Sequence, residues 1–282
     1  HIIDGLTFTL QGAYVTNIKE TKDYRKECWY DDVNYHGPDQ LGETISRWSR
    51  YTLDALLNYD KTFNQDHHFK AMVGYKIEKY DYRNLYAFRK NFPNSEVTDL
   101  NGGDSSTQTN SGYSRELALL SYFGRLNYDY KGKYLLTATF RADGSSKFAP
   151  SHQWGYFPAA AAAWRISDEA FMENTRDWLD NLKLRVSYGT SGSDNIDASL
   201  WRETWKTKQI TVDGEKVTTY VPGDMKGNPD LKWETTISRN LGVDFGFFNN
   251  WVRGSLDYYW NTTKNILMKV PIDAASGYSY QF

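Results

Sequence analysis

Apolar and polar residues alternate one by one along most of this 282-residue chain. The pattern recurs about nine times, in runs such as residues 6–14, 51–59, 69–78 and 120–130. Successive side chains of a β-strand point to opposite faces of a sheet, so this alternation predicts strands with one apolar and one polar face. The chain is therefore predicted to be all-β and antiparallel.

The predicted strands are long, and the connections between them alternate in length. Several runs extend to about 11 to 14 residues, whereas strands of globular proteins average about five or six and a tilted strand needs about 9 to 11 to cross a bilayer. Long connections are expected at residues 18–44, 81–114 and 190–232, and shorter ones at 61–66, 131–133, 144–153, 166–181 and 248–250. Short turns at one end and long loops at the other are typical of an outer-membrane β-barrel with extracellular long loops.

Aromatic residues are abundant in a chain that is polar on average. It contains 22 Tyr, 14 Phe and 10 Trp, yet its mean hydropathy is −0.70. Rings with a polar tip suit the boundary between membrane and water, where they form girdles around a barrel. The predicted girdle residues near strand ends are Tyr59, Tyr128, Tyr130, Tyr134 and Trp164.

The alternation also predicts which side chains face lipid. The residues assigned to the lipid face of the wall are Leu126, Leu136, Phe140, Val243 and Leu256. Thr137 is assigned to the opposite, wet face, because neighbouring strand residues point in opposite directions.

Two segments depart from the simple pattern. Residues 156–164 consist mostly of alanine and contain Pro158, which has no N–H for a ladder, but their place in the series still favours a strand. The segment SDEAFMENTRDWLDN predicts a short helix, with Ser167 as the N-cap and with Asp168 and Glu169 near the positive end of the helix dipole.

Composition excludes several classes of function. A net charge of −2 provides no basic surface for nucleic acid. No run of 18 apolar residues could form a transmembrane helix, and the single cysteine, Cys28, cannot form an internal disulfide. His67 and His68 are neighbours that would point to opposite faces of a strand, so they could not bind one metal ion together. The sequence contains no nucleophile motif and no phosphate-binding motif. The sequence therefore predicts no enzyme, no cofactor and no metal site.

Five segments in order resemble one known family. They are YFGRLNYDYKGKYLLTATFRADGSSKF at 122–148, WGYFPAAAAAWRISDEAF at 154–171, LKLRVSYGTSG at 182–192, NPDLKWETT at 228–236 and LDYYWNTTKNIL at 256–267. Residues 117–282 resemble the SusC/RagA family of TonB-dependent outer-membrane transporters from Bacteroidetes, and the combination is more specific than any one segment.

The resemblance implies a transmembrane antiparallel β-barrel of roughly 22 strands closed by a plug. Such a transporter sits in the cell outer membrane and imports large nutrients, usually glycans or peptides, beneath a SusD-like surface lipoprotein and with energy from TonB. Residues 1–282 would then be part of the barrel domain, about nine strands of it, with the plug, the TonB-contacting segment and the other strands outside this chain. The alternatives that remain open are a passive outer-membrane porin and a soluble glycan-binding β-domain.

Aromatic residues in two predicted loops are candidates for binding cargo, because sugar rings stack on aromatic side chains. The loop at 18–44 carries Trp29, Tyr30 and Tyr35, and the loop at 190–232 carries Trp201 and Trp205. The last two would share one face if LWRETW forms a helical turn. The alternative is that these rings pack only against their own loops or a partner lipoprotein.

Overall fold

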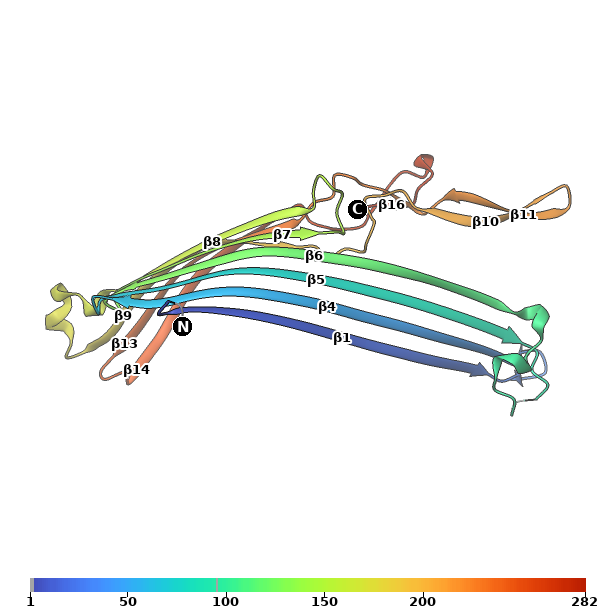
Figure 1. The fold of residues 1–282 in the computed structure, drawn as a ribbon, viewed down its shortest axis with the longest axis horizontal. Helices are drawn as coiled ribbons and strands as arrows, with labels where there is room; N and C mark the ends of the chain where they lie inside the picture. The colour runs from blue at the N-terminus through green and yellow to red at the C-terminus, as the bar shows by residue number, and fades with distance from the viewer. Residues whose placement is uncertain (1–2, 95) are drawn as a thin grey trace. The chain divides into compact units, whose positions relative to one another are not determined.

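The computed structural model describes residues 3–94 and 96–282, and most of them lie in β-strands. Nine strands in this part of the chain form one sheet whose order follows the sequence (Figure 1). From β6 to β14 every neighbouring pair is antiparallel, as predicted. The strands of this sheet are β1 (Leu6–Arg25), β4 (Gln40–Phe63), β5 (His67–Lys90), β6 (Thr109–Tyr130), β7 (Tyr134–Ser145), β8 (Trp154–Arg165), β9 (Leu179–Ser193), β13 (Glu234–Phe247) and β14 (Val252–Lys264).

The chain divides into two compact units. The main unit comprises His1–Gln11, Leu53–Ile77 and Leu119–Phe282, so it contains all of β7, β8, β9, β13 and β14. The second unit comprises Gly12–Thr52 and Glu78–Ala118, which contribute the remaining parts of β1, β4, β5 and β6.

The strands of the second unit are longer than the sequence pattern predicted. The expected loops at 18–44 and 81–114 are partly wrong, because β1 continues to Arg25, β4 begins at Gln40, β5 ends at Lys90 and β6 begins at Thr109. Polar cross-strand contacts hold these extensions together, which period-two analysis cannot detect. Examples are the ion pair of Lys22 on β1 with Glu43 on β4 (3.4 Å) and the hydrogen bond of Asn84 on β5 with Ser46 on β4 (3.0 Å).

The short connections lie where they were predicted. β6 and β7 are joined by residues 131–133, and β13 and β14 by residues 248–251. The alanine-rich segment is a strand, β8, and Pro158 is accommodated because the ladder between β8 and β9 begins at the next residue, Ala159. No helix in the described residues is long and apolar enough to span a membrane.

A hairpin lies within the expected loop at 190–232. Strands β10 (Trp205–Val212) and β11 (Glu215–Pro222) pair through a two-residue turn in which Asp213 and Gly214 have φ values of +53° and +85°. An Asp-Gly pair is a strong hairpin indicator, so this element could have been found from sequence. The minor strands are β2 (Cys28–Trp29), β3 (Tyr35–His36), β12 (Met225–Lys226), β15 (Val270–Pro271) and β16 (Tyr280–Gln281).

Five short 3₁₀ helices complete the described secondary structure, and they are η1 (Leu100–Gly102), η2 (Ser105–Thr107), η3 (Ile166–Asp168), η4 (Ala170–Thr175) and η5 (Ala274–Ser276). The predicted helix after residue 166 is therefore present as η3 and η4, but its predicted cap is wrong. Ser167 lies inside η3, and the N-cap positions of η3 and η4 are Arg165 and Glu169.

The hydrophobic core of the main unit lies among its connections. Its buried residues are Phe148, Phe157, Ile196, Leu200, Met225, Leu231 and Trp233. Trp233 packs against the rings of Phe148 and Phe157, with centroids 5.4 and 5.5 Å apart, and its Nε1 donates to the carbonyl oxygen of Gln153 (2.8 Å). Three of the segments that resemble the SusC/RagA family, those containing Phe148, Phe157 and Trp233, thus meet in one core.

Candidate functional site

The main unit presents two chemically different faces, which the strand register defines. We call one the apolar face; it contains Leu126, Tyr128, Leu136, Phe140, Val186, Leu241, Val243 and Leu256. Along one row of this face Tyr128, Leu136, Ala162, Val186 and Leu241 follow each other across five strands. The five residues predicted to share a face therefore do so, and Leu136, Phe140 and Leu256 are 51%, 50% and 70% exposed.

The opposite side, the polar face, carries Arg125, Asn127, Thr137, Arg141, Arg185, Asp244 and Asp257. Thr137 lies there as predicted and its hydroxyl donates to Asn127 Oδ1 (3.0 Å). In a single-layer sheet such a face must meet water, a ligand or another polar surface, because buried charges need partners.

A charge network links three strands on the polar face. Arg185 of β9 donates to Asp244 of β13 through Nη2 (2.8 Å) and Nε (3.0 Å), and its Nη1 lies 3.1 Å from Asp257 Oδ1 on β14. Gly242 leaves room for it, since a Cβ there would lie 2.8 Å from the Arg185 Cζ. One guanidinium thus joins carboxylates of two neighbouring strands.

A second polar group borders a hollow of about 410 Å³ on the same face. Arg141 Nε donates to Asp143 Oδ2 (2.6 Å), its Nη2 donates to Ser121 (2.9 Å), and its guanidinium lies 5.3 Å from the Phe123 ring centroid. Asp143 is 9% exposed, and its Oδ1 has no hydrogen-bond partner among the described residues. The hollow is thus lined by the side chains of Arg125 and Arg141 and by phenylalanine rings, which suit a polar ligand or another part of the protein.

Aromatic residues line the short-turn end of the apolar face, as predicted for a girdle. The rings of Tyr130, Tyr134 and Trp164 follow each other with centroids 6.2 and 6.4 Å apart, and Phe171 continues the row. At the neighbouring strands, Tyr59 contacts Phe69, and Tyr128 shares a 2.7 Å hydrogen bond with His67 Nδ1.

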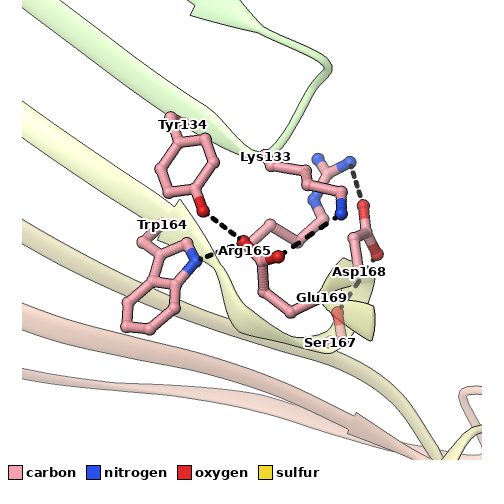
Figure 2. A network of polar contacts seen from close by, with 7 residues as sticks. All are labelled: Lys133, Tyr134, Trp164, Arg165, Ser167, Asp168 and Glu169. Atoms are coloured by element: carbon pink, nitrogen blue, oxygen red, sulfur yellow. Dashed lines mark hydrogen bonds and ion pairs between the residues drawn. The ribbon is translucent and has the colours of Figure 1, made fainter. Parts of the chain in front are cut away.

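Glu169 holds the polar tips of this row (Figure 2). Tyr134 Oη and Trp164 Nε1 both donate to Glu169 Oε1, at 2.6 and 3.0 Å, and Lys133 Nζ lies 3.4 Å from Oε2. The hydrogen bonds from Tyr134 and Trp164, followed by the charge of Lys133, hold the pKa of Glu169 below its usual range. The sequence pattern predicts Glu169 at a helix end but does not predict these contacts, because they depend on the register between strands.

The candidate cargo-binding rings lie in connections of the two units. In the second unit Trp29 and Tyr30 are 64% and 73% exposed, and Trp29 pairs in register with Tyr35, whose side chain lies outside the described part of the structure. In the main unit Trp201 is half-buried beneath the guanidinium of Arg202, 4.2 Å from its ring centroid, whereas Trp205 is 62% exposed.

The expected helical turn at LWRETW is wrong. Leu200 and Trp201 lie in a turn, residues 203 and 204 have no regular structure, and Trp205 already begins β10. The shared helical face proposed for Trp201 and Trp205 is therefore not formed.

The sheet is an antiparallel meander of one layer, with one apolar and one polar face. Aromatic rings line its short turns, and the connections at the other ends of the strands are longer. These features define the wall of a transmembrane β-barrel. The chain belongs to the family described as TonB dependent receptor-like, beta-barrel, whose model matches residues 3–282. The SusC/RagA resemblance is confirmed by the individual similarities.

Named relatives match the chain over most of its length. It is 34% identical over 258 residues to TonB-dependent receptor P39 of Formosa agariphila. The aligned region covers 84% of this chain and 22% of that protein. It is 34% identical over 186 residues to TonB-dependent receptor SusC of Bacteroides thetaiotaomicron. This aligned region covers 63% of this chain and 18% of that protein.

The fold is similar to that of a solved transporter. The structure of the RagAB peptide transporter aligns with a TM-score of 0.86 and 26% identity, over 99% of this chain and 30% of that one. A structure of the RagAB peptide importer in its closed-closed state gives a TM-score of 0.87. The chain thus spans less than a third of the length of each of these relatives.

Proposed function

We propose that this chain forms part of the wall of an outer-membrane transporter that imports large nutrients, such as oligosaccharides or peptides. The observation that carries the proposal is the two-faced sheet, whose apolar face suits lipid and whose charged face suits a wet lumen. Similarity to SusC and to the RagAB peptide transporter supports import of a large solute.

The proposed partners are a SusD-like surface lipoprotein that covers the long-loop side and TonB, which transmits energy. The plug and the TonB-contacting segment would belong to parts of the protein outside residues 1–282, together with the strands that complete a barrel of roughly 22. An open sheet edge in lipid would leave backbone groups unpaired at several kcal/mol each, so the wall needs those strands.

Uptake by cells tests this proposal. Cells that express the full-length protein are expected to take up its labelled oligosaccharide or peptide only when TonB and the surface lipoprotein are present. Uptake that persists without TonB would favour a passive porin. Migration on a denaturing gel that does not change on heating would contradict a membrane barrel.

We further propose that exposed loop rings capture cargo. Trp29 and Tyr30, and separately Trp205, project large apolar surfaces that can stack on sugar rings or peptide side chains. Trp201 is half-buried beneath Arg202, so its contribution would be smaller.

Calorimetric titration of the purified transporter and its surface lipoprotein tests the loop proposal. Double replacement of Trp29 and Tyr30, or of Trp201 and Trp205, with alanine is expected to weaken cargo binding, by about 0.5 to 1.5 kcal/mol for each exposed ring lost. Heat-modifiable migration should stay unchanged. Unaltered affinity in both variants would remove these rings from the binding site.

A further inference from the structure

Arg239 of β13 is a cation on the apolar face. Its cross-strand neighbours are Tyr188 on β9 and Trp260 on β14, and Tyr188 shares its row with Ala160. Two residues further along β13, Leu241 continues the same face. A guanidinium is costly in the middle of the hydrocarbon layer and nearly free of cost close to the headgroups, so its depth and its partners decide its role.

The guanidinium of Arg239 is held between two rings. Its Cζ lies 5.8 Å from the ring centroids of both Tyr188 and Trp260, and Nη1 donates to Thr262 Oγ1 at 3.3 Å. No carboxylate among the described residues forms an ion pair with it. Donor groups of a fixed, charged guanidinium therefore remain open on this face.

Arg239 lies far from the short-turn end. It precedes Phe247, the last residue of β13, by eight positions. At about 3.4 Å per residue and a tilt of about 40°, that separation is roughly 20 Å along the barrel axis, within an apolar band about 25 Å tall. Arg239 is thus placed near the boundary on the long-loop side, where Tyr188 and Trp260 suit a second girdle.

An apolar groove begins beside this cation. It has a volume of about 620 Å³, and the small side chains of Ala138, Ala160 and Ala162 form its floor. Its rim includes Leu126, Tyr128 and Tyr188. Because the ring of Tyr188 borders the groove and also stacks near Arg239, the groove and the cation are contiguous.

We propose that the apolar face carries a site for a phosphate-bearing lipid of the outer leaflet, with an acyl chain in the alanine-floored groove and the phosphate on Arg239. Guanidinium and phosphate form strong, directional hydrogen bonds, which supplies the charge complementarity at the headgroup depth. This site rests on the membrane orientation proposed above.

Native mass spectrometry of the full-length detergent-purified protein tests the site, with lipid A and its dephosphorylated form as probes. Arg239→Ala is expected to lower retention of lipid A by about tenfold or more, since hydrogen bonds to charged groups are stronger than neutral ones. Retention of dephosphorylated lipid A should not change. Arg253→Ala, which removes an arginine from the polar face of β14, is the matched control and should leave both unchanged.

Two further variants keep the test decisive. Arg239→Lys retains the charge and should retain most of the preference for phosphate, while Ala160→Leu fills the groove and should lower retention of both lipids. Equal binding of lipid A by wild type and Arg239→Ala, or competition by inorganic phosphate alone, would overturn the lipid site. Heat-modifiable migration and TonB-dependent uptake should persist in Arg239→Ala, so a failure here is separable from a failure of the proposed transport function.

Discussion

Glu169 shows how one carboxylate can orient several interfacial side chains. It accepts hydrogen bonds from a lysine, a tyrosine and a tryptophan that belong to two separate stretches of sequence, residues 133–134 and residue 164. Charge-assisted hydrogen bonds are stronger than neutral ones. The Glu169 carboxylate therefore holds the connection between β8 and β9 against the rings of Tyr134 and Trp164. We infer that it anchors the girdle at the short-turn end.

The lowered pKa of Glu169 predicts a pH dependence. Its folded-state pKa is below the ordinary value of 4.5, so the folded protein binds fewer protons than the unfolded chain. The stability it contributes is present above that ordinary value and is lost as the pH falls through the lowered pKa. Glu169→Gln should therefore destabilise the full-length barrel near neutral pH and should differ less from wild type in acid.

Urea unfolding followed by tryptophan fluorescence between about pH 7 and pH 3 measures this difference. Glu173→Gln is the control, since Glu173 is 73% exposed and its ion pair with Arg176 is long, at 3.9 Å. A constant difference between Glu169→Gln and wild type across the pH range would show that ionisation of Glu169 does not matter.

Neighbouring residues on β7 offer a direct comparison of the two faces. Leu136→Arg should destabilise the barrel by about 1 to 2 kcal/mol, because its side chain lies on the apolar face just inside the ring row and the penalty for arginine rises with depth in the bilayer. Thr137→Arg should reduce the stability of the barrel much less, because the new side chain projects from the polar face. Only the hydrogen bond between Thr137 and Asn127 is lost there. Refolding into liposomes measures both, and equal costs would contradict the assignment of the faces.

At the scale of elements, the Arg185 network ties together the last three strands of the sheet. Gly242 lies between its members, and an added Cβ would come within 2.5 Å of Asp257 Oδ1 and 2.8 Å of Arg185 Cζ. Gly242→Ala should therefore displace the network and destabilise the protein by about 1 kcal/mol, because the displaced groups end flexible, partly exposed side chains.

Equilibrium unfolding of the full-length protein measures the effect of Gly242→Ala. Gly124→Ala is its control, because the nearest atom to an added Cβ is Met72 O at 3.6 Å, an ordinary contact. Similar stability changes for the two variants would mean that strand propensity, and not the network, sets the cost.

At the scale of the whole molecule, the meander predicts that its turns and long loops lie on opposite sides of the membrane. With Cys28 replaced by serine, single cysteines at Val33, Ser106 or Lys216 should react with an impermeant thiol reagent on intact cells. Cysteines at Glu173 or Trp251 should not react. Asp39 is unsuitable as a probe position because it accepts hydrogen bonds from Tyr24 Oη and from the backbone N–H of Glu27.

Quantitative labelling before and after cell lysis gives the measurement. All five positions should react after lysis, which controls for accessibility, since Val33 and Trp251 are 86% and 85% exposed. Reaction of the short-turn positions on intact cells would reverse or refute the proposed orientation.

The sequence by itself determined the strands of the main unit, their two faces and their short turns. Alternation and turn residues are local properties of the backbone, so the turn at 131–133 and the shared face of Leu126, Leu136 and Val243 could be predicted. The β10–β11 hairpin was predictable too, from Asp213 and Gly214.

Only the tertiary structure decided what the polar and irregular segments do. The extensions of β1, β4 and β5 make polar contacts between strands, which leave no periodic pattern in a single strand. The roles of Glu169 and Arg239 depend on register, because pairing brings together residues that are distant in sequence. Residues 200–204 form no helical turn, because the chain passes from a turn directly into the β10–β11 pairing at Trp205. Strand pattern is set locally, whereas side-chain partners are set by which strands pair and at which register.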